Sequence, residues 1–442
     1  MKRIFPAIIV FVSLAVTSAA QDNAIAYLNA RIIPIVGQPI EQGVLLVQGG
    51  KITAVGDART VRLSSDVTIV DLAGKTIMPG LVDTHSHIGG PAGADSTGPI
   101  QPDVRILDSL NARSSSIQRA QAGGITTANV MPGSGHLDSG QTLYLKLRDD
   151  AVKIDDILIF DKDGKYMGGI KFANGTNSLR SAGGSFPGTR AKSAALVREQ
   201  FIKAQEYRDK IQKAGSDKSK LPARDLAMEA LLEVLDGKRM VHFHTHRHDD
   251  IMTALRLQKE FGFRIVLQHV SEAWKVADEI AKAKAPASII MIDAPGGKLE
   301  TVDVGYQNGV ALEKAGALVG FHTDDSITDS RWFLRSAGLA VRAGMSPDAA
   351  LYGMTLAGAK MLDLDARVGS LEVGKDADFI VLSGDPLSVY THVLQTYVEG
   401  KKVFDRSDPK DYIYAVGGKG ATDDGDMSSH IHCFDGDLGG GN

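Results

Sequence analysis

The chain has 442 residues, 43% of them hydrophobic, which is enough to bury a large core as one big domain or two. Its formal net charge of −4 is small for this length and argues against nucleic acid, or a strongly charged macromolecule, as a partner. Cys433 is the only cysteine, which excludes an intrachain disulfide framework and a cysteine-rich zinc module.

Residues 1–20 have the layout of a secretory signal. Lys2 and Arg3 give a positive start, residues 4–16 form an apolar run, and Ser18-Ala19-Ala20 offers a small-residue cleavage site. The run is shorter than the ~20 residues needed to span a bilayer, and Gln21 rather than a cysteine follows the expected cut, so a lipoprotein anchor is not supported. We expect a mature protein without a membrane span, exported to the periplasm or the extracellular space.

Two segments, residues 21–79 and 369–414, read as short strands separated by glycine turns. Neither segment is long enough to form a good core alone, so we expect them to pair into one small composite β-sandwich domain. The predicted strands are 26–28, 44–47, 52–55, 67–70, 379–382 and 396–398.

Between them, residues 80–368 alternate apolar runs with amphipathic helical stretches, the pattern of repeated β/α units. The length is somewhat above that of a typical (β/α)8 TIM barrel, and we predict an α/β fold of this type. Such barrels carry their chemistry at the carboxyl ends of the strands. The predicted strands are 81–85, 126–130, 169–172, 241–244, 265–269, 289–292 and 318–322, and nine of the chain's 12 histidines lie in this segment.

The first predicted barrel strand ends in a His-x-His pair, His85 and His87. Side chains two residues apart in a strand share a face, so both imidazoles point the same way. Two neutral imidazoles on one face begin a metal site, although the pair alone is equally compatible with one packed and one solvated histidine.

Two further strand ends carry histidines. His242, His244 and His246 share one face, although a solvated loop explains His246 and His248 equally well. The next strand ends at His269, which alone is more often a satisfied core residue than a metal ligand.

Lys171 lies at the end of an apolar strand, and lysine is almost never fully buried without a partner. The last strand leads into His322 and then Asp324-Asp325, a pair that by itself is usually a turn or a helix cap. Each signal is weak alone, and five of them at the strand ends of one barrel are strong together.

Because of these residues, the chain resembles the metal-dependent amidohydrolase superfamily. Within that superfamily it resembles the imidazolonepropionase-like group, which also includes Xaa-Pro dipeptidases. The resemblance covers nearly all of the mature chain. It is carried by residues 80–87 (GLVDTHSH), by the helix at 355–362 (TLAGAKML) and by residues 369–378 (GSLEVGKDAD), where similar chains re-enter the β-sandwich.

The resemblance implies a site of one or two divalent cations, zinc being the expected metal. It implies that Lys171 is carboxylated and bridges two metals; if Lys171 stays an amine, one cation is expected. The ligands that it implies are His85, His87, Lys171, His244, His269 and Asp324.

The implied activity is hydrolysis of an amide or peptide-like C–N bond in a small molecule or short peptide. A catalytic zinc lowers the pKa of its water towards ~7 and polarises a carbonyl, so a metal-activated hydroxide attacks the carbon. Asp324 would act as general base and then general acid. The alternatives are a deaminase or a cyclic-amide hydrolase of the imidazolonepropionase type, or a non-catalytic binding or metal-storage protein on the same fold.

The chain departs from the family pattern at Arg247. Imidazolonepropionases and cytosine deaminases typically carry a glutamate there, three residues after the strand-five histidine, so Arg247 disfavours both assignments. His246 faces the same way as His244 and either binds substrate or replaces it as the ligand. His322 and His136 are further candidates for contact with substrate, His136 lying in a Gly/Pro-rich segment that also reads as a plain turn.

An insertion at residues 185–238, helical at 194–213, either caps the site, makes a homo-oligomer contact or is a longer barrel helix. Residues 415–442 are rich in Gly, Asp and Ser and are predicted to be a flexible tail. An accessory metal site at His430, His432 and Cys433 is the alternative.

Overall fold

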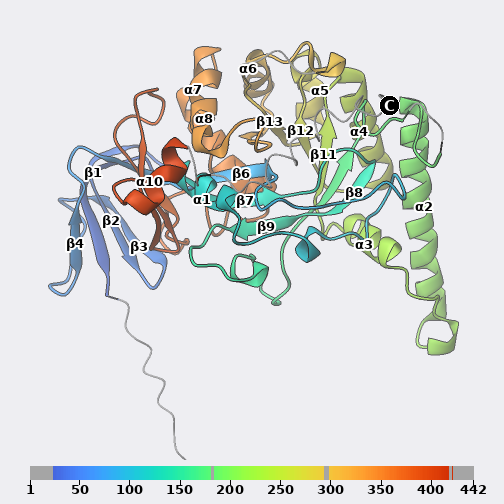
Figure 1. Cartoon of the computed structure of the whole chain (residues 1–442), viewed down its shortest axis with the longest axis horizontal. Helices are drawn as coiled ribbons and strands as arrows, with labels where there is room; N and C mark the ends of the chain where they lie inside the picture. The colour runs from blue at the N-terminus through green and yellow to red at the C-terminus, as the bar shows by residue number, and fades with distance from the viewer. Residues whose placement is uncertain (1–22, 181–183, 293–297, 418–420, 422–442) are drawn as a thin grey trace, which may run out of the picture.

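The computed structural model describes residues 23–180, 184–292, 298–417 and 421 (Figure 1). The predicted export signal, and His430, His432 and Cys433 of the predicted tail, lie outside these residues. Within the described part, no helix combines the length and the apolar character needed to cross a membrane.

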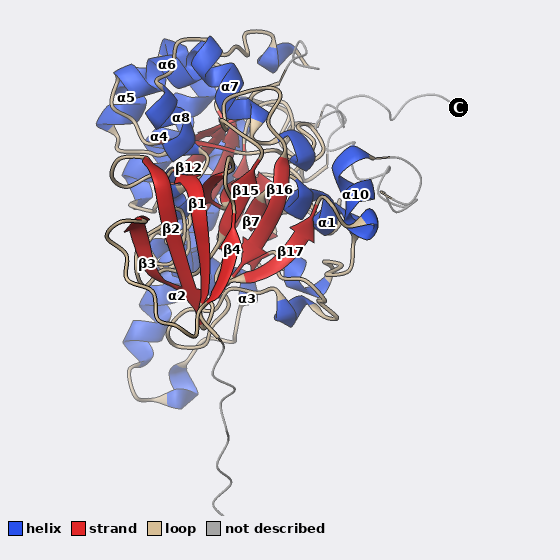
Figure 2. Ribbon diagram, turned by 90° about the vertical axis from the view of Figure 1, so that its left-hand side faces the viewer, coloured by secondary structure: helices blue, strands red, loops and turns tan. Residues whose placement is uncertain are grey.

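One eight-stranded sheet joins the two ends of the chain (Figure 2). Its order is β17-β16-β15-β5-β1-β2-β3, with β4 paired to β1. The N- and C-terminal segments meet where β15 pairs antiparallel with β5, from Phe379 opposite Pro79 to Leu382 opposite Thr76. The strands are β1 (Ile25–Ile32), β2 (Ile40–Gln48), β3 (Lys51–Asp57), β4 (Thr68–Asp71), β5 (Thr76–Pro79), β15 (Phe379–Leu382), β16 (Val393–Val398) and β17 (Lys401–Asp405).

Three aromatic side chains form the centre of this sheet's core. The rings of Tyr27, Phe379 and Tyr397 lie 4.3–5.3 Å apart, so a strand from the N-terminal segment packs directly against two from the C-terminal segment. The hydrogen bonding describes one sheet here, and the predicted sandwich and domain boundaries stay predictions.

The middle of the chain forms two further sheets, one in the order β14-β13-β12-β11-β10-β8 and one in the order β6-β7-β9. The predicted strand positions agree with the observed ones to within a few residues. The strands are β6 (Leu81–Ser86), β7 (Ile125–Val130), β8 (Asp138–Gln141), β9 (Leu143–Lys146), β10 (Ile170–Ala173), β11 (Val241–Thr245), β12 (Ile265–His269), β13 (Ala287–Ile289) and β14 (Val319–Phe321).

The segment between β7 and β10 differs from the parallel barrel pattern. Strand β9 runs antiparallel to β7, and β8 runs antiparallel to β10. A parallel strand needs a crossover of a dozen or more residues, and residues 131–137 are too few for one, so the chain turns back instead. These two strands were not predicted, and they leave the middle of the chain as two hydrogen-bonded sheets rather than one closed ring.

The helices lie around these strands, and α2 is at the edge farthest from β1–β4 in Figure 1. Phe201 of α2 stacks at 5.8 Å on Phe172 of β10 and at 4.9 Å on Phe261 of α4, so the insertion packs as a long helix against the outside of the strands. The helices are α1 (Ser115–Ala122), α2 (Arg190–Ala214), α3 (Leu226–Leu235), α4 (His248–Phe261), α5 (Ala277–Lys282), α6 (Gln307–Lys314), α7 (Arg335–Arg342), α8 (Pro347–Gly353), α9 (Leu356–Met361) and α10 (Pro409–Val416).

Helix α10 is a second difference from the sequence prediction, which continued strands and turns to residue 414. Asp408 caps this helix by accepting from the Lys410 N–H, and Pro409 occupies its first turn, where its missing N–H costs nothing.

Candidate metal centre

The first group of the site is His85, His87 and Asp324. Strand β6 is buried along its whole length and delivers His85 at its end, with His87 just beyond. Asp324 follows β14, and its Oδ1 lies 3.3 Å from His85 Nε2 and 3.0 Å from His87 Nε2. The three ligand atoms fall within 4.8 Å of one another, and the structure therefore joins three of the predicted ligands.

The orientation of His87 is fixed by a backbone carbonyl. Its Nδ1 lies 2.8 Å from the Met131 carbonyl oxygen, which can only accept, so Nδ1 carries the proton. In a neutral imidazole, Nε2 then keeps its lone pair and faces a carboxylate oxygen at 3.0 Å. Two acceptors at this distance repel each other unless a proton or a cation lies between them, so these residues fit a divalent cation.

The backbone beneath this group is held by Asp83, whose carboxylate accepts from the Thr323 N–H at 3.0 Å and the Thr323 hydroxyl at 2.6 Å. Burial raises the pKa of Asp83 to about 7. Burial also acts to raise the pKa of Asp324, but His85, His87 and His269 outweigh it and hold that pKa well below its ordinary value. Asp324 is therefore an anion held among imidazoles.

Lys171 lies beside the same group, on β10, and is fully buried. Its Nζ is 3.0 Å from His85 Nε2 and 3.1 Å from Met131 Sδ. As an amine, Lys171 directs its N–H to the lone pair that His85 would offer to a cation.

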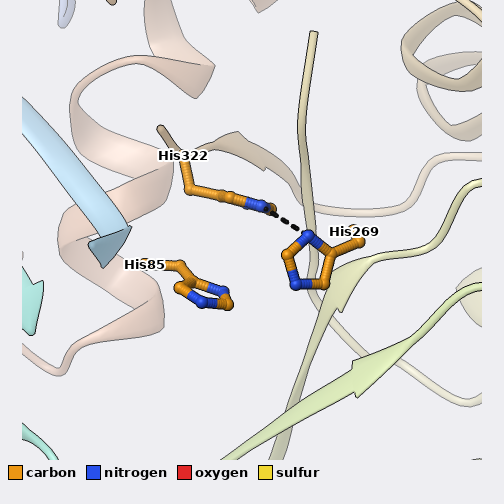
Figure 3. A group of neighbouring side chains, drawn as sticks. All are labelled: His85, His269 and His322. Carbon is orange, nitrogen blue, oxygen red and sulfur yellow. Dashed lines mark hydrogen bonds between the residues drawn. The ribbon is translucent and has the colours of Figure 1, made fainter. Parts of the chain in front are cut away.

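His85, His269 and His322 form a second group (Figure 3). His322 Nε2 lies 3.1 Å from His269 Nδ1, and its Nδ1 lies 2.8 Å from the Ser288 hydroxyl, which is in turn 2.5 Å from the Thr84 hydroxyl. Burial lowers the pKa of His322 to about 3. His322 is fully buried in this network, and its predicted contact with substrate stays a prediction.

His244, His246 and Glu300 form a third group. His244 lies one residue before the end of β11, and its Nε2 is 3.3 Å from Asn177 Nδ2, while His246 Nδ1 lies 2.8 Å from the Ser271 hydroxyl. Burial lowers the pKa of both imidazoles well below its usual value and keeps them neutral, as metal ligands must be. Glu300 was missed by sequence reasoning, because it sits in a short 3-10 turn, Leu299–Thr301, that carries no recognisable motif.

Two residues that the sequence singled out lie elsewhere. His136 Nε2 lies 2.8 Å from the Asp95 carbonyl and belongs to none of the three groups. Arg247 precedes α4 and pairs with Asp249 at 2.9 Å on an exposed part of the helix.

The comparisons with known proteins cover most of the chain. A model of the amidohydrolase family matches residues 76–405. Imidazolonepropionase of Alkaliphilus metalliredigens is 23% identical over 83% of this chain and 91% of its own length. Amidohydrolase tasK of Hapsidospora irregularis is 28% identical over 82% of this chain and 40% of its own, so the chain spans less than half of that protein. The crystal structure of an amidohydrolase from Thermotoga maritima has a TM-score of 0.80 at 34% identity, covering 86% of this chain and all of that one.

Proposed function

The chain belongs to the amidohydrolase family, whose members are metal-dependent enzymes acting on carbon–nitrogen bonds, and from this premise we propose that it hydrolyses an amide or peptide-like bond of a small molecule or short peptide. The proposed divalent cation, zinc by ligand type, is held by His85, His87 and Asp324. Because the chain belongs to this family of enzymes, we do not propose the alternative of a non-catalytic binding or metal-storage protein.

One contact carries this proposal. The Met131 carbonyl occupies His87 Nδ1, so Nε2 is the ring nitrogen that faces Asp324 Oδ1 at 3.0 Å, and a divalent cation would find a nitrogen and an oxygen donor side by side there. When bound, the cation would polarise the substrate carbonyl and acidify a water. Asp324 is proposed to take up the proton at its carboxylate and return it to the leaving nitrogen. Lys171, His244 and His269 are proposed as further ligands by resemblance alone.

The predicted barrel and second domain are likewise proposed from the resemblance to the family. Residues 80–368 would form the (β/α)8 barrel, supported by the parallel strands β10 to β14 and by the Asp324 N–H donating to the His85 carbonyl at 2.9 Å, which brings the first and last strands together. Residues 21–79 and 369–414 would form the second domain. Residues 1–20 are proposed as an export signal on their sequence pattern, which places the enzyme in the periplasm or outside the cell.

The test combines elemental analysis with product analysis on the purified protein. We expect at least one zinc-like equivalent per chain, and hydrolysis of one or more members of a panel of N-acyl amino acids, dipeptides and cyclic amides that stops on chelation and returns with added Zn²⁺. His87→Ala should lose the cation, and the exposed His248→Ala serves as control. Ammonia as the released product would favour the deaminase instead, and a metal content unaffected by His87→Ala would refute the proposed site.

A further inference from the structure

A cavity of about 480 Å³ lies between helix α7, the loop of residues 383–392 that joins β15 to β16, and the residues that follow β17. We call it the α7 cavity. Its volume falls within the range of small-molecule sites, about 300–1,000 Å³. None of the residues of the three histidine groups lines it, so the α7 cavity is separate from the candidate metal centre.

One part of the α7 cavity is lined by large apolar side chains. They come from α7 and from the loop that faces it, and include Leu334, Leu339, Leu387, Trp332 and Val389. Trp332 and Val389 stay 51% and 84% exposed. Single exposed apolar residues are common on a protein surface, but several of them around one cavity mark a place where an apolar group binds.

The other part of the lining is strongly positive. Four arginines contribute to it, Arg331, Arg335, Arg342 and Arg406, and none of the lining residues in the described part of the chain is acidic. Asp329 neutralises Arg331 at 2.5 Å. Within residues 23–180, 184–292 and 298–417, no ion pair or side-chain hydrogen bond is formed by Arg342 or Arg406. The α7 cavity therefore holds positive charge that no lining residue offsets.

The acid next to Arg406 in the chain is engaged elsewhere. Asp405 pairs with Lys402 at 2.6 Å and accepts from the Ser407 N–H at 3.0 Å. The Arg406 guanidinium instead lies 5.6 Å from the centre of the Tyr412 ring, an attraction between charge and ring that forms no N–H···O bond. Its N–H groups are therefore available to a ligand, and a guanidinium binds a carboxylate or phosphate through two parallel hydrogen bonds.

We propose that the α7 cavity binds an amphipathic organic anion, a small molecule with a carboxylate or phosphate head and an apolar body. The head binds the guanidinium groups of Arg342 and Arg406, and the body packs on the apolar part of the lining. An uncharged apolar ligand would leave the guanidinium groups unpaired, and an inorganic anion would leave the apolar side chains in water. The proposal does not depend on the proposed function.

The chain itself is a second source of carboxylates. Residues 422–442 contain five aspartates and neither lysine nor arginine. The volume of the α7 cavity is that of a small-molecule site, which favours a separate ligand. A chain that ends at Ala421 lacks these aspartates and distinguishes the two sources.

The experiment uses Trp332 as a reporter inside the α7 cavity. The chain has two tryptophans, and Trp274→Phe leaves Trp332 as the only one. The probe is decanoate, titrated into this variant of the full chain below the concentration at which micelles form, with the fluorescence of Trp332 as readout. We expect a saturable change with decanoate. Acetate, which lacks the apolar body, and decyltrimethylammonium, which has the opposite charge, should give no saturable change over the same range.

In the same background, Arg342→Met and Arg406→Met should each weaken decanoate binding about tenfold, with circular dichroism to verify folding. Arg256→Met, an exposed arginine of α4 outside the α7 cavity, is the matched control and should bind as tightly as its parent. A purely structural role of Arg342 in the last turn of α7 predicts a change in stability and none in decanoate affinity.

Three results would overturn the proposal. The first is no saturable response to decanoate, or an equal response to decyltrimethylammonium. The second is decanoate affinity in both Arg342→Met and Arg406→Met that matches Arg256→Met. The third is decanoate binding at least about tenfold tighter in the chain ending at Ala421 than in the full chain, because the occupant would then be the chain's own aspartates. Equal affinity in these two chains supports a separate ligand.

Discussion

The contact between His87 and Asp324 determines how these two residues can act in the site. His87 is held by the Met131 carbonyl, and neighbouring imidazoles hold the pKa of Asp324 well below its ordinary value despite burial. A carboxylate that stays ionised can bind a cation, and it can accept a proton from a water that a bound cation would acidify. Asp324 is therefore both ligand and proton acceptor in the proposed reaction.

Replacing Asp324 with asparagine should distinguish the effect of its negative charge from the effect of its size and shape. Asp324→Asn keeps the side-chain size, removes the proton acceptor and one anionic ligand, and should lower kcat by about 10²–10⁴-fold while weakening zinc binding. The measurement is kcat in excess zinc together with metal content. Asp249→Asn, which breaks only the exposed pair with Arg247, is the control. A kcat within threefold of the wild type would contradict the assigned role.

At this scale the sequence predicted some residues and missed others for a physical reason. His85 and His87 share a face because strand side chains alternate, and a motif shows that directly. Glu300 groups with His246 from the short 3-10 turn Leu299–Thr301, and such a turn leaves no periodic pattern in the sequence.

At the scale of elements, a buried ion group joins β9 to the segment that leads out of the middle of the chain. Lys146 Nζ lies 2.8 Å from Asp376 and 2.5 Å from Asp378, and all three side chains are buried. Asp376 also pairs with Lys51 of β3 at 2.5 Å. One ammonium therefore connects β9 to the residues just before β15, and the sequence did not predict it because β9 itself was not foreseen.

Lys146→Met should destabilise the protein strongly, because it leaves Asp376 and Asp378 buried without their shared cation. Breaking a buried pair in this way costs about 3–5 kcal/mol. Urea unfolding at pH 7 is the measurement, and Lys162→Met, an exposed lysine for which the described residues show no ion pair, is the control. Equal unfolding midpoints for the two variants would contradict the role of the group.

Asp376 of this group gives a pH dependence with a definite sign, and Asp378, whose pKa is raised by burial, gives the opposite one at higher pH. Burial acts to raise the pKa of Asp376, but Lys146, Lys51 and Arg367 outweigh it and lower the pKa to about 2. A lowered pKa means that the folded state binds this proton less readily than the unfolded state, so the stabilisation is complete above pH ~4 and disappears as the pH falls towards 2. Unfolding measured from pH 5 to 2 should show this loss in the wild type and much less of it in Lys146→Met.

At the scale of the whole molecule, β5 and β15 make the two ends of the chain depend on each other. Strand β5 lies between β1 and β15, so without the C-terminal strands the remaining sheet would expose a new edge and lose two of the three aromatic rings of its core. The sequence predicted this pairing because each segment was too short to form a core alone. It could not predict that the hydrogen bonding would run through one continuous sheet, since strand order depends on contacts between residues far apart in the chain.

Two truncations test this dependence. A chain ending at Val368 loses β15, β16, β17 and α10, and should fail to fold because Tyr27 then loses both of its aromatic neighbours. A chain ending at Ala421 keeps every described element, including Ala421 itself, whose carbonyl accepts from Arg119 at 3.4 Å, and should unfold at the wild-type temperature. Circular dichroism during heating measures both. If the shorter chain unfolds cooperatively near the wild-type temperature, the fold does not need the C-terminal strands. If the shorter chain does not fold and the longer chain behaves as the wild type, the N- and C-terminal segments build the sheet together.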